Sequence, residues 1–236
     1  MKNSPEVHLI PVPISEESLF TLPVDTIEVA RQLTTFLVER EKTARKWLKS
    51  FQHPIAQPDL HIIELPKHEE ITKEWLMESL QNKASFGLMS ESGTPCIADP
   101  GSIIVRQLHQ LGWKIKPHSG PNSLILALMA SGLNGQNFTF LGYLPQKQPE
   151  LQSILRKIAS DIQKTGISHL FIETPYRNFK LFQTLLSTLP PDIYLSISRD
   201  LTGTEEWIRT QSIKSWKKGD YEHILNKWPT IFILGL

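Results

Sequence analysis

Apolar residues along this chain follow two periods that alternate from the N-terminus onward. Short apolar stretches such as VHLIP and SFGLM have the composition of strands, whereas in SIIVRQLHQL apolar residues recur every three or four positions, as on a helix. The pattern predicts strands at 7–11, 35–39, 60–65, 85–90, 113–118, 138–143, 169–173, 193–199, 206–212 and 229–236. It predicts helices at 26–34, 41–50, 70–81, 102–111, 122–131, 150–165 and 176–188. This alternation is typical of an α/β fold with much parallel pairing, at least in the first half.

The length of the chain bounds the number of domains. At roughly 150 residues per domain, 236 residues make one large domain or two small ones. We expect two, an N-terminal α/β domain at 1–118 and a C-terminal α/β domain at 119–236.

Composition and charge weaken several classes of protein, without excluding an RNA-binding one, because a local basic patch can lie within a balanced total charge. The chain is 40% hydrophobic and 21% charged with a net charge of +1, which is neither the balance of a strongly basic nucleic-acid binder nor that of an acidic tail. The single cysteine, Cys96, rules out an internal disulfide and suits a reducing compartment. The N-terminus has no apolar run of the signal-peptide type, and no stretch approaches the ~18 apolar residues of a membrane span. We therefore expect a cytoplasmic protein without a membrane partner.

Several motifs of common sites are missing from the sequence. No G-x-G-x-x-G follows the first strand, and neither a P-loop nor a G-x-S-x-G elbow occurs. The eight histidines form no H-x-x-x-H pair and have no cysteine partners, so we expect no metal site. Cys96 lacks a reactive context, which favours a small apolar role over that of a nucleophile.

Three segments rich in glycine and proline keep the backbone open to a ligand. They are SESGTPCIADPG at 90–101, SGPNS at 119–123 and FLGYLP at 140–145, and each lies at the predicted carboxyl end of a strand, where ligands of open α/β sheets bind. The hydroxyls of Thr94 and Ser123 suit a ribose or an amino-acid head group. Each loop alone is explained by caps and turns, whereas three together favour a nucleoside-like ligand.

The same loops carry a resemblance to a known family. SESGTPCIADPG, SGPNSLILALMASGL and FLGYLP stand in the order of SDAGTPxIxDPG, PGPxxxxxALxxSGL and GFLP. PVPI at 11–14 resembles PTPIGNL, ETPYRN at 173–178 resembles YESPHRL, and SRDLTGTEEW at 198–207 resembles ARELTKxxEE. These are motifs of the tetrapyrrole-methylase family, in its branch of 16S ribosomal RNA cytidine 2′-O-methyltransferases, and the resemblance covers nearly the whole chain.

The resemblance implies a two-domain tetrapyrrole-methylase-like fold, S-adenosylmethionine in a cleft between the domains, and a homodimer. Carried over by motif, the cofactor-binding residues would be Pro11, Pro13, Gly93, Thr94, Pro95, Ser119, Gly120, Pro121, Ser123, Leu141 and Gly142.

The chain also departs from the branch, mainly where an acceptor would bind. SEES replaces GNL after the first strand, and Glu91 replaces the aspartate of SDAG. EDTR reads EREK, so that only Glu39 is retained. The basic K-G-R-R has become QPEL at 148–151, which removes several phosphate-binding charges.

Candidates for acceptor chemistry follow from the residue types. A ribose hydroxyl is a weak nucleophile that a base assists, and the candidate bases are Glu39, His68 and Glu173. Each has a structural alternative: a surface ion pair, a solvated loop residue and a strand-end cap, respectively. Candidate phosphate contacts are Arg45 and Lys49 on one face of the helix at 41–50, with Arg177 and Arg199. Their alternatives are a solvated helix face and structural salt bridges.

Three functions stay open. The leading hypothesis is methylation of the ribose 2′-oxygen of a cytidine, with ribosomal RNA or the small ribosomal subunit as the partner. The second is a methyltransferase that acts on a small molecule such as a tetrapyrrole. The third is a paralogue that binds cofactor or RNA with weak catalysis.

Overall fold

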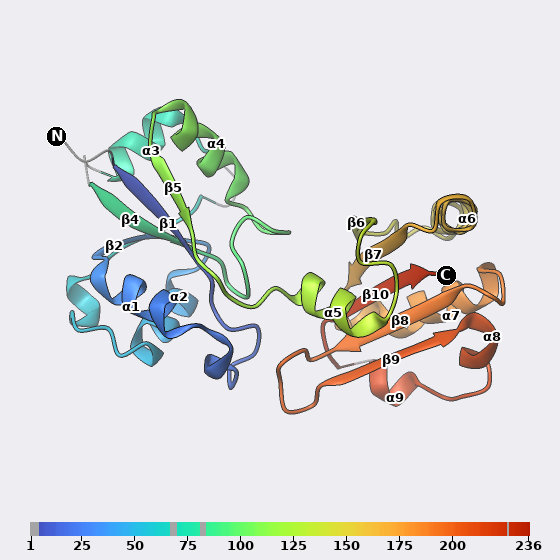
Figure 1. Ribbon diagram of the computed structural model, residues 1–236. Helices are drawn as coiled ribbons and strands as arrows, with labels where there is room; N and C mark the ends of the chain where they lie inside the picture. The colour runs from blue at the N-terminus through green and yellow to red at the C-terminus, as the bar shows by residue number, and fades with distance from the viewer. Residues whose placement is uncertain (1–4, 67–69, 81–83, 226) are drawn as a thin grey trace. The chain divides into compact units, whose positions relative to one another are not determined.

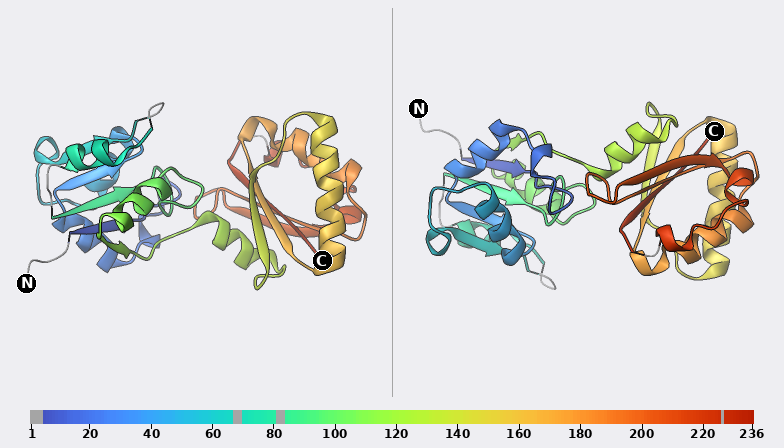
Figure 2. Two further views of the ribbon diagram at one scale, coloured as in Figure 1. Left: turned by 90° about the horizontal axis from the view of Figure 1, so that it is seen from above. Right: turned by 90° about the horizontal axis from the view of Figure 1, so that it is seen from below.

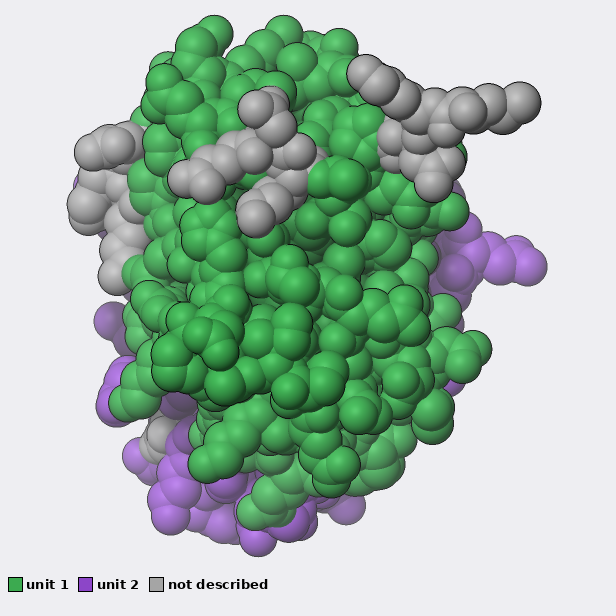
Figure 3. Space-filling model, turned by 90° about the vertical axis from the view of Figure 1, so that its left-hand side faces the viewer, with its two compact units in different colours: residues 1–122 green, residues 123–236 purple. Residues whose placement is uncertain are grey.

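A computed structural model describes residues 5–66, 70–80, 84–225 and 227–236. The chain divides into two compact units, Met1–Asn122 and Ser123–Leu236, which Figure 3 draws in different colours. The sequence analysis placed this boundary between residues 118 and 119. The positions of the units relative to one another are not determined, and each unit has its own sheet and its own core.

The described part of the first unit is built on a five-stranded sheet in which every pairing is parallel. Its order is β3-β2-β4-β1-β5, with β1 at Glu6–Ile10, β2 at Thr35–Val38, β3 at His61–Glu64, β4 at Ser85–Met89 and β5 at Lys114–Pro117. All of these strands were predicted. Because parallel strands end at one edge of a sheet, the loops that follow β1, β2, β4 and β5 lie near one another.

Helices cover both faces of this sheet (Figure 1). Phe36 and Val38 of β2 pack in the cluster of α1 (Val24–Gln32) and α2 (Glu41–Ser50). Leu37 points to the opposite face and packs in the cluster of α3 (Lys73–Leu80) and α4 (Ser102–Gln110). This alternation is the period of two that a strand imposes, so β2 is buried on both faces. Two short 3-10 turns complete the unit, η1 at Leu19–Thr21 and η2 at Gln57–Asp59.

The second unit has a mixed sheet. Its order is β6-β7-β10-β8-β9, with β6 at Phe138–Tyr143, β7 at Ser168–Glu173, β8 at Tyr194–Arg199, β9 at Trp207–Ser212 and β10 at Thr230–Gly235. Among the described strands of this second sheet, β6 and β7 form the only parallel pair, and the other pairs are antiparallel. The predicted α/β fold class is therefore confirmed in both units.

Helices again lie on both faces of the second sheet, as Figure 2 shows. α5 (Ser123–Ser131) packs on the face of Leu170 and Ile233. The other face carries α6 (Gln148–Thr165), α7 (Asn178–Thr188) and the short α8 (Ile213–Trp216). The remaining short elements are η3 at Pro175–Arg177 and α9 at Glu222–Leu225. α8 and α9 were not predicted, because four residues are too few to show a helical period.

The register of this sheet aligns one row of residues across four strands. Glu173 of β7 lies opposite Thr230 of β10, Thr230 lies opposite Arg199 of β8, and Arg199 lies opposite Trp207 of β9. Directly opposed side chains point to the same face of a sheet. Phe171, two residues before Glu173, packs in the core with α6 and α7, so this row lies at the rim of that face.

Within the described ranges, no helix combines the length and the apolar character that crossing a bilayer requires.

Candidate functional site

Three loops at the carboxyl edge of the first sheet are joined to one another. The backbone N–H of Val12, after β1, donates to the carbonyl of Gly93, after β4, at 2.9 Å. The hydroxyl of Thr94 donates to the carbonyl of Pro121, after β5, at 2.9 Å. The three loops therefore form one connected stretch of backbone at the edge where ligands of α/β sheets bind.

Two glycines allow this arrangement, for different reasons. Gly93 has a φ of +70°, a left-handed conformation that glycine adopts without strain. Gly120 lies so close to Pro11 that an added Cβ would be 2.3 Å from the Cβ of that proline. Gly93 is thus required by its backbone angle, and Gly120 by packing between two loops.

Hydroxyl groups hold these loops in place. Thr26 of α1, which is buried, donates to the carbonyl of Ser119 at 2.8 Å. Ser92 donates to the carbonyl of Ile14 at 3.2 Å. The Thr94 hydroxyl was expected to face a ligand, but its proton is used within the protein, so it offers a ligand only an acceptor.

The predicted cofactor residues fall into both units. The structure brings together in the first unit Pro11, Pro13, Gly93, Thr94, Pro95, Ser119, Gly120 and Pro121. Ser123 is the first residue of α5, and Leu141 and Gly142 lie on β6, all in the second unit. Gly142 has a φ of +66° at an irregularity in the β6–β7 register. Cofactor binding by these residues stays a prediction.

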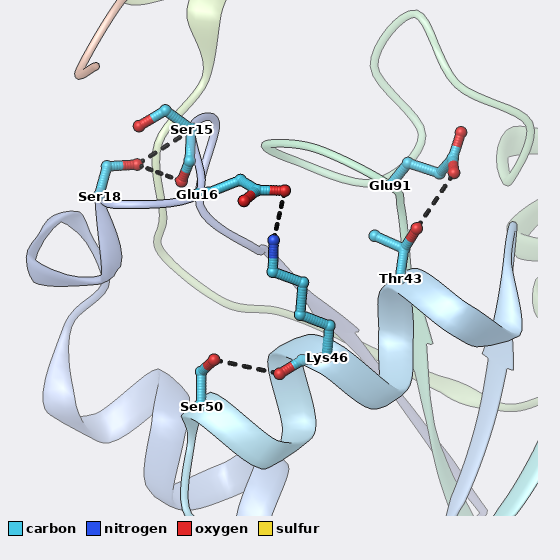
Figure 4. A network of polar contacts seen from close by, with 7 residues as sticks. All are labelled: Ser15, Glu16, Ser18, Thr43, Lys46, Ser50 and Glu91. Carbon is cyan, nitrogen blue, oxygen red and sulfur yellow. Dashed lines mark hydrogen bonds and ion pairs between the residues drawn. The ribbon is translucent and has the colours of Figure 1, made fainter. Parts of the chain in front are cut away.

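Helix α2 is tied to the same loops, as Figure 4 shows. Thr43 donates to a carboxylate oxygen of Glu91 at 3.3 Å, and Lys46 forms an ion pair with Glu16. Ser18 donates to the carbonyl of Ser15 at 3.0 Å and so shapes the loop that carries Glu16. Helix α2 therefore supports the loops after β1 and β4 through Thr43 and Lys46.

Of the predicted phosphate contacts on α2, one is engaged within the protein. Arg45 pairs with Glu41 at 2.6 Å and also donates to the carbonyl of Gln57. Lys49 is exposed, and no acid of the described residues forms an ion pair with it. Lys49 is thus the freer of the two groups toward a ligand.

Three carboxylates gather beside the loop after β4. Glu39, which follows β2, accepts the backbone N–H of Glu91 at 3.3 Å, and burial raises the pKa of Glu39. Burial first, and then the charges of Glu39 and Glu91, raise the pKa of Asp99 to about 7. Arg40 balances part of this charge through an ion pair with Glu91 at 3.2 Å. The cluster favours a positively charged ligand group at this end of the sheet.

Asp99 and Pro100 have the sequence of a helix N-cap followed by a first helical residue, but they do not start α4. α4 begins at Ser102, and Gly101 occupies the capping position without a side-chain bond. Cys96 and Ala98 have φ values of 70° and 63°, and these two left-handed residues turn the loop before the helix starts. Asp99 instead lines a small cavity together with Glu39 and Cys96. The volume of this cavity is about 10 Å³, enough for one water molecule at most.

Cys96 is half-buried and packs against the apolar cluster of α3 and α4, as expected of a small apolar residue. Burial and, to a smaller extent, the charge of Asp99 raise the pKa of its thiol to about 11. A neutral thiol is a poor nucleophile at physiological pH.

In the second unit Glu173 and Arg177 form an ion pair. The Glu173 side chain is 1% exposed, and its Oε2 lies 2.7 Å from Nη2 of Arg177. Its Oε1 accepts the backbone N–H of Thr174 at 2.7 Å. One oxygen is therefore held by a hydrogen bond and the other by the ion pair alone, and the carboxylate fixes the guanidinium of Arg177.

This ion pair lines a cavity of about 170 Å³ at the carboxyl end of β7. Two leucines, Leu151 and Leu181, line it. The polar lining residues are Gln146, Gln148, Glu173, Arg177 and Lys180. The sequence analysis included Glu173 and Arg177 but missed the glutamines and Lys180. The spacing of three residues between Arg177 and Lys180, one helical turn, was the available signal.

The remaining candidates are placed as follows. Arg199 ends β8 opposite Thr230, and its buried Nε has no hydrogen-bond partner within the described part of the chain. His68 lies outside the described residues. No group of three or more histidines, cysteines or carboxylates suited to a metal ion occurs among the residues that the structure describes.

No protein-family model matches the chain, but individual proteins do. "Ribosomal RNA small subunit methyltransferase I" of Vibrio cholerae is 31% identical over 206 residues, which are 87% of this chain and 68% of that protein. The protein of the same name from Haemophilus influenzae is 31% identical over 80% of this chain and 66% of its own length. The one from Escherichia coli O157:H7 is 27% identical over 91% and 73%.

A solved structure has the same fold. Uroporphyrin-III-C-methyltransferase from Thermus thermophilus superimposes with a TM-score of 0.54, covering 98% of this chain and 94% of that chain at 16% sequence identity. The chain spans about two thirds of the length of its Vibrio and Haemophilus relatives. At this identity and coverage, with the tetrapyrrole-methylase fold in both units, the chain belongs to the family of the ribosomal RNA small subunit methyltransferases I.

Proposed function

We propose that this protein transfers a methyl group from S-adenosylmethionine to small-subunit ribosomal RNA, at the ribose 2′-oxygen of a cytidine. The observation that carries the proposal is the set of three joined loops at the carboxyl edge of the first sheet, in a chain of this family. The likeness to the uroporphyrin enzyme concerns the fold alone, so it gives a tetrapyrrole acceptor no comparable support.

The residues at this edge fit the cofactor in chemical character. When bound, S-adenosylmethionine supplies a methyl group on a positively charged sulfur, and transfer is an in-line displacement that depends on alignment. Gly93 gives the loop after β4 a bare backbone, and the cluster of Glu39, Glu91 and Asp99 favours a cation. The Pro11 and Ser119 loops would hold the nucleoside part through their main chain.

We assign the role of general base to Glu39. As the methyl group bonds to the ribose oxygen and its bond to sulfur breaks, the hydroxyl proton must leave, and a carboxylate of raised pKa accepts it more readily. Burial raises the pKa of Glu39, and only its Oε2 has a described hydrogen bond, with the backbone of Glu91. Glu173 is less suited, because its side chain is only 1% exposed and its charge is paired with Arg177.

Two measurements test the proposal. Calorimetric titration of the purified chain with S-adenosylmethionine, in buffer containing a chelator, should show binding at micromolar levels, because the displacement needs no divalent metal. Tritiated methyl should then appear in RNA of small ribosomal subunits from cells that lack this gene. A methylated 2′-oxygen blocks alkaline cleavage of the next phosphodiester bond, so a cleavage-resistant dinucleotide identifies the position.

The outcomes separate the competing functions. Transfer to a tetrapyrrole but not to RNA would replace the proposal with the small-molecule hypothesis. Cofactor binding without transfer to any acceptor would favour a catalytically weak paralogue. Absence of heat at high cofactor concentration would refute methyl transfer altogether.

We propose further that the protein is a cytoplasmic homodimer. The support is the family resemblance of the motifs and the single cysteine, Cys96. Light scattering after gel filtration should give twice the chain mass of 27.0 kDa. A mass of one chain at micromolar concentration would contradict the dimer.

A further inference from the structure

We propose that the cavity at the start of α7 is a subsite for single-stranded RNA, in which Arg177 and Lys180 hold a phosphate and Tyr176 stacks on an unpaired base. The inference rests on the proposed function, since it concerns how the acceptor is held. It adds a binding element that lies wholly within the second unit.

The cavity has the size and lining of a site for one small polar group. Its volume of about 170 Å³ is below the roughly 300–1,000 Å³ of pockets that enclose whole drug-sized ligands. Leu151 and Leu181 form apolar wall, and the amides of Gln146 and Gln148 add hydrogen-bonding groups. One phosphate with part of its sugar matches this combination.

The buried carboxylate of Glu173 prepares Arg177 to bind an anion. It is 1% exposed and contacts one end of the guanidinium, whereas the Arg177 side chain is 31% exposed. A guanidinium has five N–H donors, and this contact uses a minority of them. The remaining donors can bind phosphate oxygens in a fixed orientation, which lowers the entropy lost on binding.

Lys180 makes the cavity positive. The charge of Glu173 is offset by Arg177, and no acid of the described residues forms an ion pair with Lys180. Lys180 lies one helical turn beyond Arg177, and both side chains line the cavity. The surplus charge therefore favours an anion over a cation or a neutral group.

Tyr176 identifies the anion as part of a nucleic acid. It precedes Arg177 in η3, and its side chain is 93% exposed, the highest value among the exposed large apolar residues of the described chain. A tyrosine ring in water beside a phosphate-binding pair is the arrangement in which proteins stack on single-stranded bases. A free phosphate or a lipid head group has no base that could stack on the ring.

Binding of a fluorescent single-stranded 12-nucleotide RNA, followed by anisotropy at several salt concentrations without cofactor, tests the subsite. Lys180→Gln should weaken binding and reduce the slope of log K against log salt by about 0.7, the value for one lost phosphate contact on a single strand. Tyr176→Ala should weaken binding about 5- to 150-fold, the range of one lost stacking contact, and leave the slope unchanged. Tyr176→Phe should bind like the wild type.

Matched controls isolate these effects. Lys164→Gln removes the same charge from an exposed site about 24 Å along α6 from Gln148 and should leave both affinity and slope unchanged. Tyr194→Ala, at the far end of β8 from Arg199, is the control for Tyr176→Ala. Circular dichroism establishes that each variant is folded.

The result distinguishes this inference from the proposed function. If the wild type methylates RNA while Lys180→Gln and Tyr176→Ala bind like their controls, the subsite is refuted and the methyltransferase stands. The subsite is likewise refuted if the wild type does not bind the RNA. Loss of binding in both variants, in a protein that shows no cofactor heat, would support the subsite and refute methyl transfer.

Discussion

At Gly120 two loops of the candidate site approach so closely that even a methyl group does not fit. An added Cβ would lie 2.3 Å and 2.7 Å from the Cβ and Cγ of Pro11, and the rigid proline ring cannot turn aside. The sequence suggested that Gly120 lets a ligand approach, whereas the structure shows that it lets Pro11 approach. Gly120 is therefore required for the packing of these two loops.

Gly120→Ala should lower the free energy of unfolding by about 1–3 kcal/mol, the usual cost of overpacking. Urea denaturation measures the change. Gly135→Ala is the matched control, because nothing lies within 4 Å of its added Cβ, and it should change stability by less than about 0.5 kcal/mol. Equal stability of the two variants would mean that the Pro11 loop moves without cost.

Asp99 should make the stability of the protein depend on pH. Burial first, and then the charges of Glu39 and Glu91, raise its pKa in the folded state to about 7, from 3.8. The folded state therefore binds more protons than the unfolded state between about pH 4 and pH 7, so this residue's contribution to stability falls as pH rises through that window. Asp99→Asn should be more stable than the wild type at pH 8 and lose that advantage toward pH 4. A difference that stays constant from pH 4 to pH 8, measured by urea denaturation, would contradict the raised pKa.

At the scale of elements, the periodicity of apolar residues predicted the strands and the longer helices. It missed short helices and loop conformations, which depend on contacts between distant residues. β2 was recognisable because its apolar run is buried on both faces, and α6 because its apolar residues recur over 18 residues. α8 shows no period in four residues. Asp99 has the sequence of a helix cap. However, Cys96 and Ala98 adopt left-handed conformations that prevent it from capping α4, and no local sequence rule predicts those conformations.

In the candidate site, too, local sequence patterns predicted some features, and contacts between distant segments determined the others. Motif matching identified the loops of Gly93 and Gly120, because their glycines and prolines are visible in the sequence. It gave no indication that the hydroxyl of Thr94 donates to the carbonyl of Pro121, or that Arg45 donates to the carbonyl of Gln57. Such bonds join segments far apart in the chain, and only the fold determines them.

The junction of β7 and α7 depends on the ion pair between Glu173 and Arg177. Arg177→Met leaves a buried carboxylate without its cation, which should cost roughly 3 kcal/mol of unfolding free energy, or less because Arg177 is partly exposed. Adding Glu173→Gln to Arg177→Met should restore much of the loss. Chemical denaturation of the two single variants and the double variant gives the coupling as a double-mutant cycle. If the two changes add without coupling, the pair is not what holds this junction.

For the whole molecule, a net charge of +1 means that RNA cannot be held by overall attraction. The basic segment that the family carries after its third loop reads QPEL here, so phosphate contacts must come from local groups elsewhere. Lys49 on α2 and Lys180 on α7 are exposed and have no ion-pair partner among the described residues. One belongs to each unit.

If both units bind the same RNA molecule, the effects of these two lysines should add. Lys49→Gln and Lys180→Gln should each flatten the salt dependence of RNA binding by about 0.7, and the double variant by about twice that, since each removes one phosphate contact. Cofactor affinity should not change, because neither lysine belongs to the joined loops of Gly93 and Gly120. Anisotropy with small-subunit RNA fragments at four salt concentrations measures the slopes, with Lys164→Gln as the control. A double variant no flatter than Lys180→Gln alone would remove α2 from the RNA site and leave recognition to the second unit.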